Sequence, residues 1–318
     1  MSYKVIIPED ITEPGKEFLR EKGYEVVVVD GTSSQEFEEQ AKEADALLAR
    51  TAKYPREILE KMPKLKVIGR HGVGYDNIDM DYCNDKKIWV TITPNANSNA
   101  VAEHTIMLIL ACARNLTYQN RQLLLGNGWK TRNTCKGQEV AGKTLGVIGC
   151  GRIGRQVAKK AALGLDMKVI GYDPMLPADA ALDYIERVET AEQVFAEADF
   201  VSLHLPETEQ TRKMVNRKLL SLMKPTASLI NCARGGIVDE DDLYDALEQG
   251  RIYGAGVDVM AEEPFRQDNR LLRLDHMIVT PHDAALNVET MDKMGMDAAL
   301  GIHEALGGHT PSWPVNKF

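Results

Sequence analysis

Three ionisable residues in the second half of the chain are of types that perform acid–base chemistry: Arg234, Glu263 and His282. An imidazole can transfer a proton, a carboxylate can orient that imidazole, and a guanidinium can bind an anion. Each residue also has a simpler explanation. Arg234 can be a surface charge, Glu263 can belong to an exposed acidic pair, and His282 can cap the segment after Pro281. Local sequence leaves both explanations open.

The clearest motif is a glycine turn, Gly149-Cys150-Gly151-Arg152-Ile153-Gly154, between two apolar runs. A helical pattern follows the turn, and Asp173 closes the second run. This order of strand, glycine turn, helix, strand and acid is typical of a dinucleotide-binding βαβ unit. Gly149 would permit the tight turn, Gly151 the close approach of a pyrophosphate, and Gly154 the contact of helix with strand.

The acid at the end of the second run predicts which dinucleotide binds. The carboxylate of Asp173 can accept hydrogen bonds from both ribose hydroxyls, and it would repel a 2′-phosphate. The residues directly after it offer no arginine or lysine. We therefore expect NAD rather than NADP, although Asp173 before Pro174 can also be a simple turn former.

The elements that must position these residues alternate between strand and helix along most of the chain. Such alternation indicates doubly wound parallel sheets, whose ligands bind beyond the carboxyl ends of the strands. In the first part we expect strands at Tyr3–Ile7, Glu25–Val29, Ala46–Leu48, Lys66–Ile68 and Ile88–Thr91. After the glycine turn we expect them at Phe200–Leu203, Ser228–Ile230, Ala255–Val259 and Met277–Val279.

A second glycine-containing loop follows the predicted strand that ends at Ile68. Its glycines let the backbone N–H groups of Val73 and Gly74 face outward as a nest for an anion. Arg70 adds a fixed positive charge beside them. The alternative is a plain tight loop with Arg70 on the surface.

The order of the elements predicts two α/β domains, with the second inserted into the first. A long helix over 288–306 can pack back on the first domain. We expect one domain from residues 1–98 and 289–318, and a nucleotide domain from 99–288. A helix over 100–116 carries an apolar stripe suited to the core or to a dimer contact, whereas 121–139 is expected to be a surface loop without chemistry.

Composition excludes several classes of protein. A net charge of −9, from 38 basic and 47 acidic residues, disfavours nucleic-acid and anionic-membrane binding. The apolar stretches are too short to span a bilayer, and no secretory signal is evident at the N-terminus, so we expect a cytoplasmic protein. Five scattered cysteines and dispersed histidines indicate neither a disulfide framework nor a metal site.

Motifs in order along nearly the whole chain resemble those of the D-2-hydroxyacid dehydrogenase family. They are GRHGVGYDNID, NSNAVAEHT, GCGRIG, LHLPETEQT, NCARGGIVDEDDL, GVDVMAEEP and TPHDAA. The resemblance implies a Rossmann NAD-binding domain inserted into a flavodoxin-like substrate domain. It also implies hydride transfer between NAD and a small anionic 2-hydroxy or 2-oxo acid, in a homodimer built across the NAD-binding domains.

The resemblance implies roles for individual residues. Arg234, Glu263 and His282 would form the catalytic triad, in which His282 transfers the proton, Glu263 orients it, and Arg234 binds the carboxylate. Val73 and Gly74 would hold the substrate carboxylate. The residues expected to line the NAD site, besides the glycines of the turn, are Arg152, Ile153, Asp173, His204, Pro206, Cys232, Asp258 and His282.

Substrate choice stays open at this stage. Arg70 resembles the arginine that phosphoglycerate dehydrogenases place near the substrate phosphate, which favours 3-phosphoglycerate over hydroxypyruvate or glyoxylate. Two departures from the family pattern are Asp283, where an apolar residue is usual, and His71 beside the anion loop. An NAD(H)-sensing, corepressor-like protein is the alternative of another class. Formate dehydrogenases resemble this family but carry glutamine where Glu263 stands.

Overall fold

The computed structural model describes residues 2–177 and 179–318 and divides the chain into two compact units. The first unit contains the residues up to Asn97 together with Ala285–Phe318, and the second is Ser98–Ala284. The boundaries expected from the sequence lay at residues 98/99 and 288/289. Assigning substrate binding to the first unit and NAD binding to the second remains our proposal.

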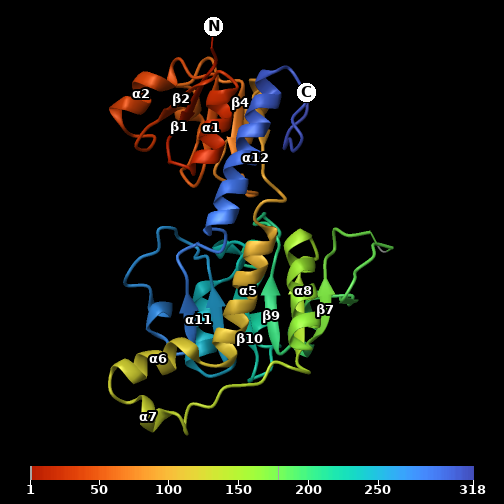
Figure 1. Ribbon diagram of the computed structural model, residues 1–318. Helices are drawn as coiled ribbons and strands as arrows, with labels where there is room; N and C mark the ends of the chain where they lie inside the picture. The colour runs from red at the N-terminus through yellow and green to blue at the C-terminus, as the bar shows by residue number, and fades with distance from the viewer. Residues whose placement is uncertain (1, 178) are drawn as a thin grey trace. The chain divides into compact units, whose positions relative to one another are not determined.

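The first unit is built on a five-stranded parallel sheet with the order β2-β1-β3-β4-β5. Apolar side chains cover both faces of its central strands, and every residue of β3 is buried, as expected for a sheet between two helix layers. Helix α12 packs with α1 and against β4 (Figure 1). The strands are β1 Lys4–Ile7, β2 Glu25–Val28, β3 Ala46–Ala49, β4 Val67–Arg70 and β5 Trp89–Thr91. The helices are α1 Glu13–Glu21, α2 Gln35–Ala41, α3 Arg56–Leu59, α4 Met80–Asp85 and α12 Val288–Leu306.

The second unit is built on a seven-stranded parallel sheet with the order β12-β11-β10-β9-β6-β7-β8. The chain starts in the middle at β6, winds outward to β8, and then returns to β9 on the other side of β6. This reversal is the topological switch point at which dinucleotides bind in such folds. The strands are β6 Thr144–Ile148, β7 Lys168–Tyr172, β8 Glu186–Arg187, β9 Phe200–Leu203, β10 Ser228–Asn231, β11 Gly254–Val257 and β12 Met277–Val279.

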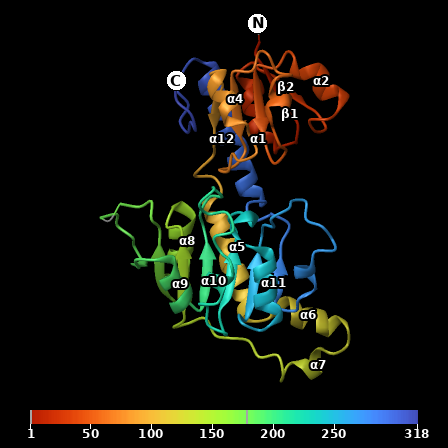
Figure 2. The same cartoon turned by 180° about the vertical axis from the view of Figure 1, so that it is seen from behind.

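Helices cover both faces of this second sheet. Helix α5 packs on β10 and β11 beside α8, and α9 packs on β6 from the other face, which the rear view in Figure 2 shows. A small residue makes the contact possible at Gly256, where an added Cβ would lie 3.1 Å from Sγ of Cys112 in α5. The helices are α5 Ser98–Ala113, α6 Leu116–Leu124, α7 Gly128–Thr131, α8 Arg152–Leu165, α9 Ala191–Glu197, α10 Arg217–Leu220 and α11 Glu240–Glu248. Two 3₁₀ turns, η1 Gly235–Ile237 and η2 Arg270–Arg273, complete the unit.

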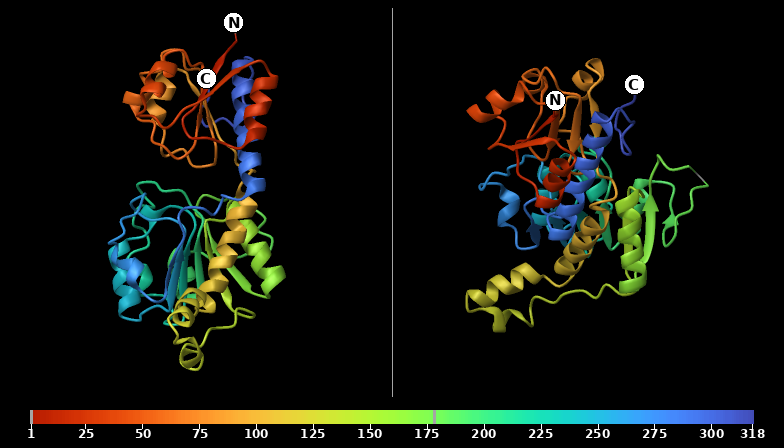
Figure 3. Two further views of the ribbon diagram at one scale, coloured as in Figure 1. Left: turned by 60° about the vertical axis from the view of Figure 1, so that its left-hand side comes forward. Right: turned by 45° about the horizontal axis from the view of Figure 1, so that its top comes forward.

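Helices α6 and α7 form an arm that projects from the rest of the second unit (Figures 1 and 3). The expectation of a loop over 121–139 was wrong in part, because α6 extends to Leu124 and α7 follows it. No residue of either helix is buried, so neither has the apolar stripe against a core by which a helix is predicted. The predicted helix over 100–116 ends earlier, at Ala113, before Asn115 adopts a left-handed conformation.

The predicted α/β architecture is confirmed, since both sheets are parallel and doubly wound. Within the part of the chain that the structure describes, no helix combines the length and apolarity needed to cross a membrane. Parallel pairing brings the carboxyl ends of β9, β10, β11 and β12 to one edge of the second sheet. The loops that leave this edge carry the predicted catalytic residues.

Candidate active site

Glu263 and His282 form a hydrogen-bonded pair on the loops after β11 and β12. Nδ1 of His282 lies 2.7 Å from Oε2 of Glu263, while Oε1 accepts the backbone N–H of Met260 at 3.1 Å. Because a carboxylate can only accept, the pairing assigns a proton to Nδ1 and leaves Nε2 to exchange a proton with another molecule. The side chain of His282 is 44% exposed and that of Glu263 is 36% exposed, so a small molecule can reach both.

Asp258 holds the loop that carries His282. The expected strand over 255–259 ends at Val257, so Asp258 is the first residue of the following loop. Its backbone oxygen accepts the N–H of His282 at 2.8 Å, and its carboxylate, on a residue only 1% exposed, accepts the N–H of Ala284 at 3.0 Å. The resemblance placed Asp258 in the NAD site, and the structure gives it this additional loop-holding role.

Arg234 lies in a turn shaped by the side chain of Asn231, the last residue of β10. The Asn231 amide donates to the backbone oxygen of Arg234 at 2.9 Å, and its oxygen accepts the N–H of Ala233 at 3.0 Å. Asn231 is 1% exposed, which makes this a rigid support. The guanidinium also donates to the backbone oxygen of Ala233 at 2.8 Å.

Gly235 brings the arginine loop against the loop that leads to Glu263. A Cβ built on Gly235 would lie 1.9 Å from the carbonyl carbon of Met260, so only glycine fits there. Because β10, β11 and β12 are neighbours in the sheet, their loops carry Arg234, Glu263 and His282 from one edge of one unit.

The glycine turn after β6 has space where a phosphate would bind. Gly149 has a φ of +92°, in the left-handed region that favours glycine. A Cβ on Gly154 would lie 2.2 Å from the backbone oxygen of Gly149, whereas a Cβ on Gly151 would meet no atom within 4 Å. No side chain caps helix α8, which begins at Arg152 and continues through Ile153. An open helix N-terminus behind a glycine turn fits a pyrophosphate.

Asp173 follows β7 and returns to the glycine turn. Its Oδ2 accepts the N–H of Cys150 at 2.9 Å, and its Oδ1 accepts the N–H of Met175 at 2.9 Å. These bonds fix the carboxylate at the point where the second strand meets the turn. A carboxylate has about four acceptor positions, so it retains capacity for hydroxyl donors.

The other predicted cofactor residues follow β9 and β10. Burial lowers the pKa of His204 to about 3, so its imidazole is neutral at physiological pH, and its Nε2 lies 2.8 Å from the hydroxyl of Ser202. Pro206 is exposed in the same loop. Burial raises the pKa of the Cys232 thiol to about 12, which makes it an unreactive, neutral group.

The anion loop belongs to the first unit. Strand β4 extends two residues beyond the predicted end at Ile68, so Arg70 is its last residue. Gly72 has a φ of +141°, and its Cβ position is 2.9 Å from Nη1 of Arg70, which packs the guanidinium across the loop. Within residues 2–177 and 179–318, the N–H groups of Val73 and Gly74 have no backbone acceptor, as an anion nest requires.

Sequence reasoning missed Arg50, which follows β3 at the same carboxyl edge as Arg70. Burial and the positive charges of Arg50 and Arg70 lower the pKa of His71 to about 4, so this imidazole is neutral. The signal available in the sequence was the position of Arg50 two residues after the predicted strand Ala46–Leu48.

Comparison with known proteins agrees with this arrangement. Residues 106–284 match the family model for the D-isomer specific 2-hydroxyacid dehydrogenase, NAD binding domain. The chain belongs to the D-isomer specific 2-hydroxyacid dehydrogenase family. Its second unit therefore contains this family's NAD-binding domain, and the predicted family membership is confirmed.

Individual members of the D-isomer specific 2-hydroxyacid dehydrogenase family match nearly the whole chain. The D-3-phosphoglycerate dehydrogenase of Methanocaldococcus jannaschii is 43% identical over 98% of this chain and 59% of its own length. The hydroxypyruvate reductase of Thermotoga maritima is 38% identical over 96% of this chain and 99% of its own. The D-lactate dehydrogenase of Aquifex aeolicus, solved with NAD and lactic acid, superposes with a TM-score of 0.83 at 31% identity and covers 96% of each chain. The chain thus spans about three-fifths of the first of these relatives and nearly all of the second.

Proposed function

We propose that this protein is an NAD-dependent dehydrogenase that interconverts a D-2-hydroxy acid and the corresponding 2-oxo acid. The observation that carries the proposal is the 2.7 Å pair between Nδ1 of His282 and Glu263, on a loop edge that also presents Arg234. When bound, the nicotinamide supplies or accepts the hydride at the substrate carbon. His282 then gives a proton from Nε2 to the developing alkoxide in reduction, and takes one back in oxidation.

Glu263 and Arg234 have different roles in the proposed reaction. The carboxylate fixes the orientation of His282 and stabilises the imidazolium before its proton is transferred. The guanidinium of Arg234 binds the substrate carboxylate and polarises the adjacent carbonyl through its fork of donors. For Val73 and Gly74 of the first unit we propose the binding of an anionic group of the substrate, because their N–H groups have no backbone acceptor among the described residues.

The proposed cofactor is NAD, held by the glycine turn and the start of α8. Gly149 has the left-handed conformation of the turn, Gly151 leaves open space for a pyrophosphate, and Gly154 lets the helix contact the turn. Asp173 presents a carboxylate beside them. That negative charge would repel a 2′-phosphate.

The proposed substrate is 3-phosphoglycerate, with 3-phosphohydroxypyruvate as its oxidised form. Arg50 and Arg70 lie at the carboxyl ends of the neighbouring strands β3 and β4, where Ala49 pairs with Arg70, so two positive charges stand at one edge of the first sheet. A substrate with a phosphate as well as a carboxylate would use both charges. The Methanocaldococcus jannaschii relative bears the name of this activity. Hydroxypyruvate is the second candidate, because the Thermotoga maritima reductase matches over 99% of its own length.

The substrate proposal is tested by the kcat/KM for reduction of 3-phosphohydroxypyruvate, hydroxypyruvate and glyoxylate. Wild type should prefer the phosphorylated substrate, and Arg70→Ala should lower its kcat/KM by about tenfold more than that of hydroxypyruvate. An equal effect on both substrates would end the phosphate role of Arg70. Tight NADH binding without turnover of any 2-oxo acid would favour the sensor function instead.

We also propose that the protein is a homodimer built across its NAD-binding domains, in the cytoplasm. The arm of α6 and α7 supports a partner surface, because Leu123, Leu124, Leu125 and Trp129 are 63%, 79%, 65% and 76% exposed. Apolar side chains gathered in this way favour burial against a partner. All five cysteines are free, as in a reducing compartment. Leu124→Glu should shift the mass measured by light scattering from dimer to monomer, and a monomeric wild type would refute the dimer.

A further inference from the structure

The loop after β12 is fastened to Asp258 by consecutive backbone groups. The backbone oxygen of Asp258 accepts from His282 at 2.8 Å, Oδ1 accepts from Asp283 at 3.0 Å, and Oδ2 accepts from Ala284 at 3.0 Å. The hydroxyl of Thr280 donates to Oδ1 at 2.5 Å. One buried residue therefore determines where the backbone of the catalytic histidine lies.

His282 needs this support because its backbone is in an unfavourable conformation. Its φ is +54°, in the left-handed region that side chains other than glycine seldom adopt. Such a conformation persists only where the surroundings determine it. The N–H of His282 is held by the backbone oxygens of Asp258 at 2.8 Å and of Thr280 at 3.0 Å. The next two residues are held by the Asp258 carboxylate, which must remain an acceptor.

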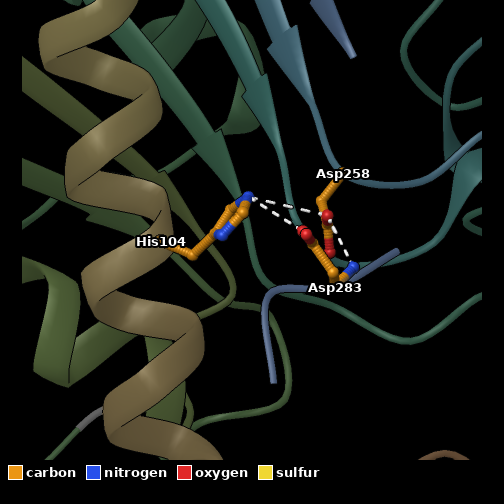
Figure 4. A group of neighbouring side chains, drawn as sticks. All are labelled: His104, Asp258 and Asp283. Carbon is orange, nitrogen blue, oxygen red and sulfur yellow. Dashed lines mark hydrogen bonds and ion pairs between the residues drawn. The ribbon is translucent and has the colours of Figure 1, made fainter. Parts of the chain in front are cut away.

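His104 of α5 reaches Asp258 through Thr280. Its Nε2 lies 3.0 Å from the Thr280 hydroxyl oxygen and 3.6 Å from Oδ1 of Asp258. Figure 4 shows the imidazole extending from its helix toward both aspartates. Since Thr280 gives its proton to the carboxylate, its oxygen must accept from His104, which assigns a proton to Nε2 of His104.

Two other ionisable groups face Asp258. Asp283 lies 3.9 Å from Nε2 of His104, and its pKa is raised by burial, by the negative charge of Asp258 and by a side-chain hydrogen bond with Asp258, so Asp283 in its protonated form is a further donor to this carboxylate. The thiol of Cys232, from the loop after β10, is held neutral by burial. A buried carboxylate is stabilised by its donors, and here the Thr280 hydroxyl, which His104 orients, adds to the N–H groups of Asp283 and Ala284.

The same atoms do not make a convincing metal site. The ligand atoms of His104, Asp258 and Asp283 all lie within 4.8 Å of one another. Both carboxylate oxygens of Asp258 already accept N–H groups of the loop, however, and Thr280 occupies the position between imidazole and carboxylate. The geometry is that of a hydrogen-bond relay.

We propose that His104 is a positioning residue for the catalytic histidine, acting through the Thr280 hydroxyl and the Asp258 carboxylate on the backbone of the loop. Donation from Nε2 of His104 orients the Thr280 hydroxyl, and the hydroxyl in turn stabilises the carboxylate that holds the backbone of Asp283 and Ala284, the two residues after the catalytic histidine. This role rests on the proposed dehydrogenase function, in which His282 must meet the substrate in a fixed orientation.

The test compares His104→Phe, which removes the donor, with His104→Gln, which retains an N–H. Amide hydrogen exchange of residues 282–284 in the full-length chain reports the loop, and steady-state reduction of 2-oxo acids reports kcat and KM. In His104→Phe, the amides should exchange about tenfold faster and kcat should fall about tenfold, with KM values within about twofold of wild type. His104→Gln should stay within about threefold of wild type on both measures. Glu103→Gln, an exposed position one residue earlier on α5, is the matched control and should behave as wild type.

If His104→Phe does not fold, Thr280→Val tests the same relay, because it removes the hydroxyl that links His104 to Asp258. It should reproduce the faster exchange and the loss of kcat, and the double variant should be no worse than the more impaired single variant, because both changes break one relay. Unchanged exchange at 282–284 in His104→Phe, equal impairment by Phe and Gln, or multiplied effects in the double variant would overturn the proposal. If wild type reduces no 2-oxo acid, the proposed function fails, while the exchange measurement still decides the relay.

Discussion

The backbone of Met260 occupies the space that any side chain at Gly235 would need, because a Cβ there would lie 1.9 Å from the Met260 carbonyl carbon. This contact joins the loop of Arg234 to the loop after β11, which contains both Met260 and Glu263. The N–H of the same Met260 donates to Oε1 of Glu263 at 3.1 Å. A missing side chain at one position thus aligns two of the three proposed catalytic residues.

Gly235→Ala should therefore damage both stability and turnover. Backbone must move to admit the methyl group, which we expect to lower the free energy of unfolding by about 1–3 kcal/mol and kcat by about tenfold or more. Urea unfolding and steady-state kinetics measure the two effects. Gly164→Ala in α8 is the control, because its Cβ would meet no atom within 4 Å, and it should stabilise the helix by about 0.5–1 kcal/mol. Wild-type behaviour of Gly235→Ala would show that the loops do not depend on this contact.

Glu263→Gln should lower kcat by about 10²-fold, because the neutral amide no longer stabilises the imidazolium of His282. NADH binding, followed by fluorescence, should change little, since the glycine turn and Asp173 are untouched. Glu262→Gln removes the neighbouring charge without breaking the 2.7 Å hydrogen bond to the imidazole and should retain wild-type kcat. A Glu263→Gln enzyme within about twofold of wild type would exclude this carboxylate from catalysis.

Asp283→Asn should stabilise the protein at neutral pH. Burial and the adjacent Asp258 raise the pKa of Asp283 above its ordinary value of 3.8, so the folded state binds this proton more tightly than the unfolded state. Stability contributed by the protonated form is present below pH 3.8 and is lost as the pH rises through the folded-state pKa. The unfolding midpoint of Asp283→Asn should thus exceed that of wild type at pH 7 and converge with it in acid. The exposed Asp30→Asn controls for net charge. A difference that is constant with pH would contradict this origin.

Asp173→Asn should weaken the preference for NAD over NADP. The substitution removes the charge that repels a 2′-phosphate while keeping a similar shape beside Cys150. One unit of charge at contact distance is worth about 1 kcal/mol or more, so the ratio of kcat/KM for the two cofactors should fall by about fivefold to tenfold or more. The same ratio in variant and wild type would remove Asp173 from cofactor selection.

Local sequence patterns predicted the features of the fold that depend on residues close together in the chain. Apolar runs located most strands of both sheets, the glycine turn was found from its spacing, and the final helix was predicted as Val288–Leu306, as observed. The bond between His104 and Thr280 joins residues 176 positions apart, and no periodicity signals such a polar contact. Helix α6 escaped prediction for a different reason, since it buries none of its side chains within its own unit.

The candidate site was predictable only in its parts. Arg234, Glu263 and His282 could be named because each follows a strand and lies in a family motif. The support beneath them, from Asn231, Gly235 and Asp258, became visible only with the tertiary structure, because it consists of backbone groups bound by side chains from other loops.

The central claim is that His282 transfers the proton in an NAD-dependent reduction of a 2-oxo acid. The most direct measurement is the single-turnover rate of NADH oxidation with 3-phosphohydroxypyruvate and hydroxypyruvate, in wild type and His282→Asn. We predict oxidation by wild type with at least one of these acids, and a rate about 10²- to 10⁴-fold lower in the variant with NADH binding retained. A variant that oxidises NADH at the wild-type rate, or a wild type that binds NADH and reduces neither acid, would contradict the account.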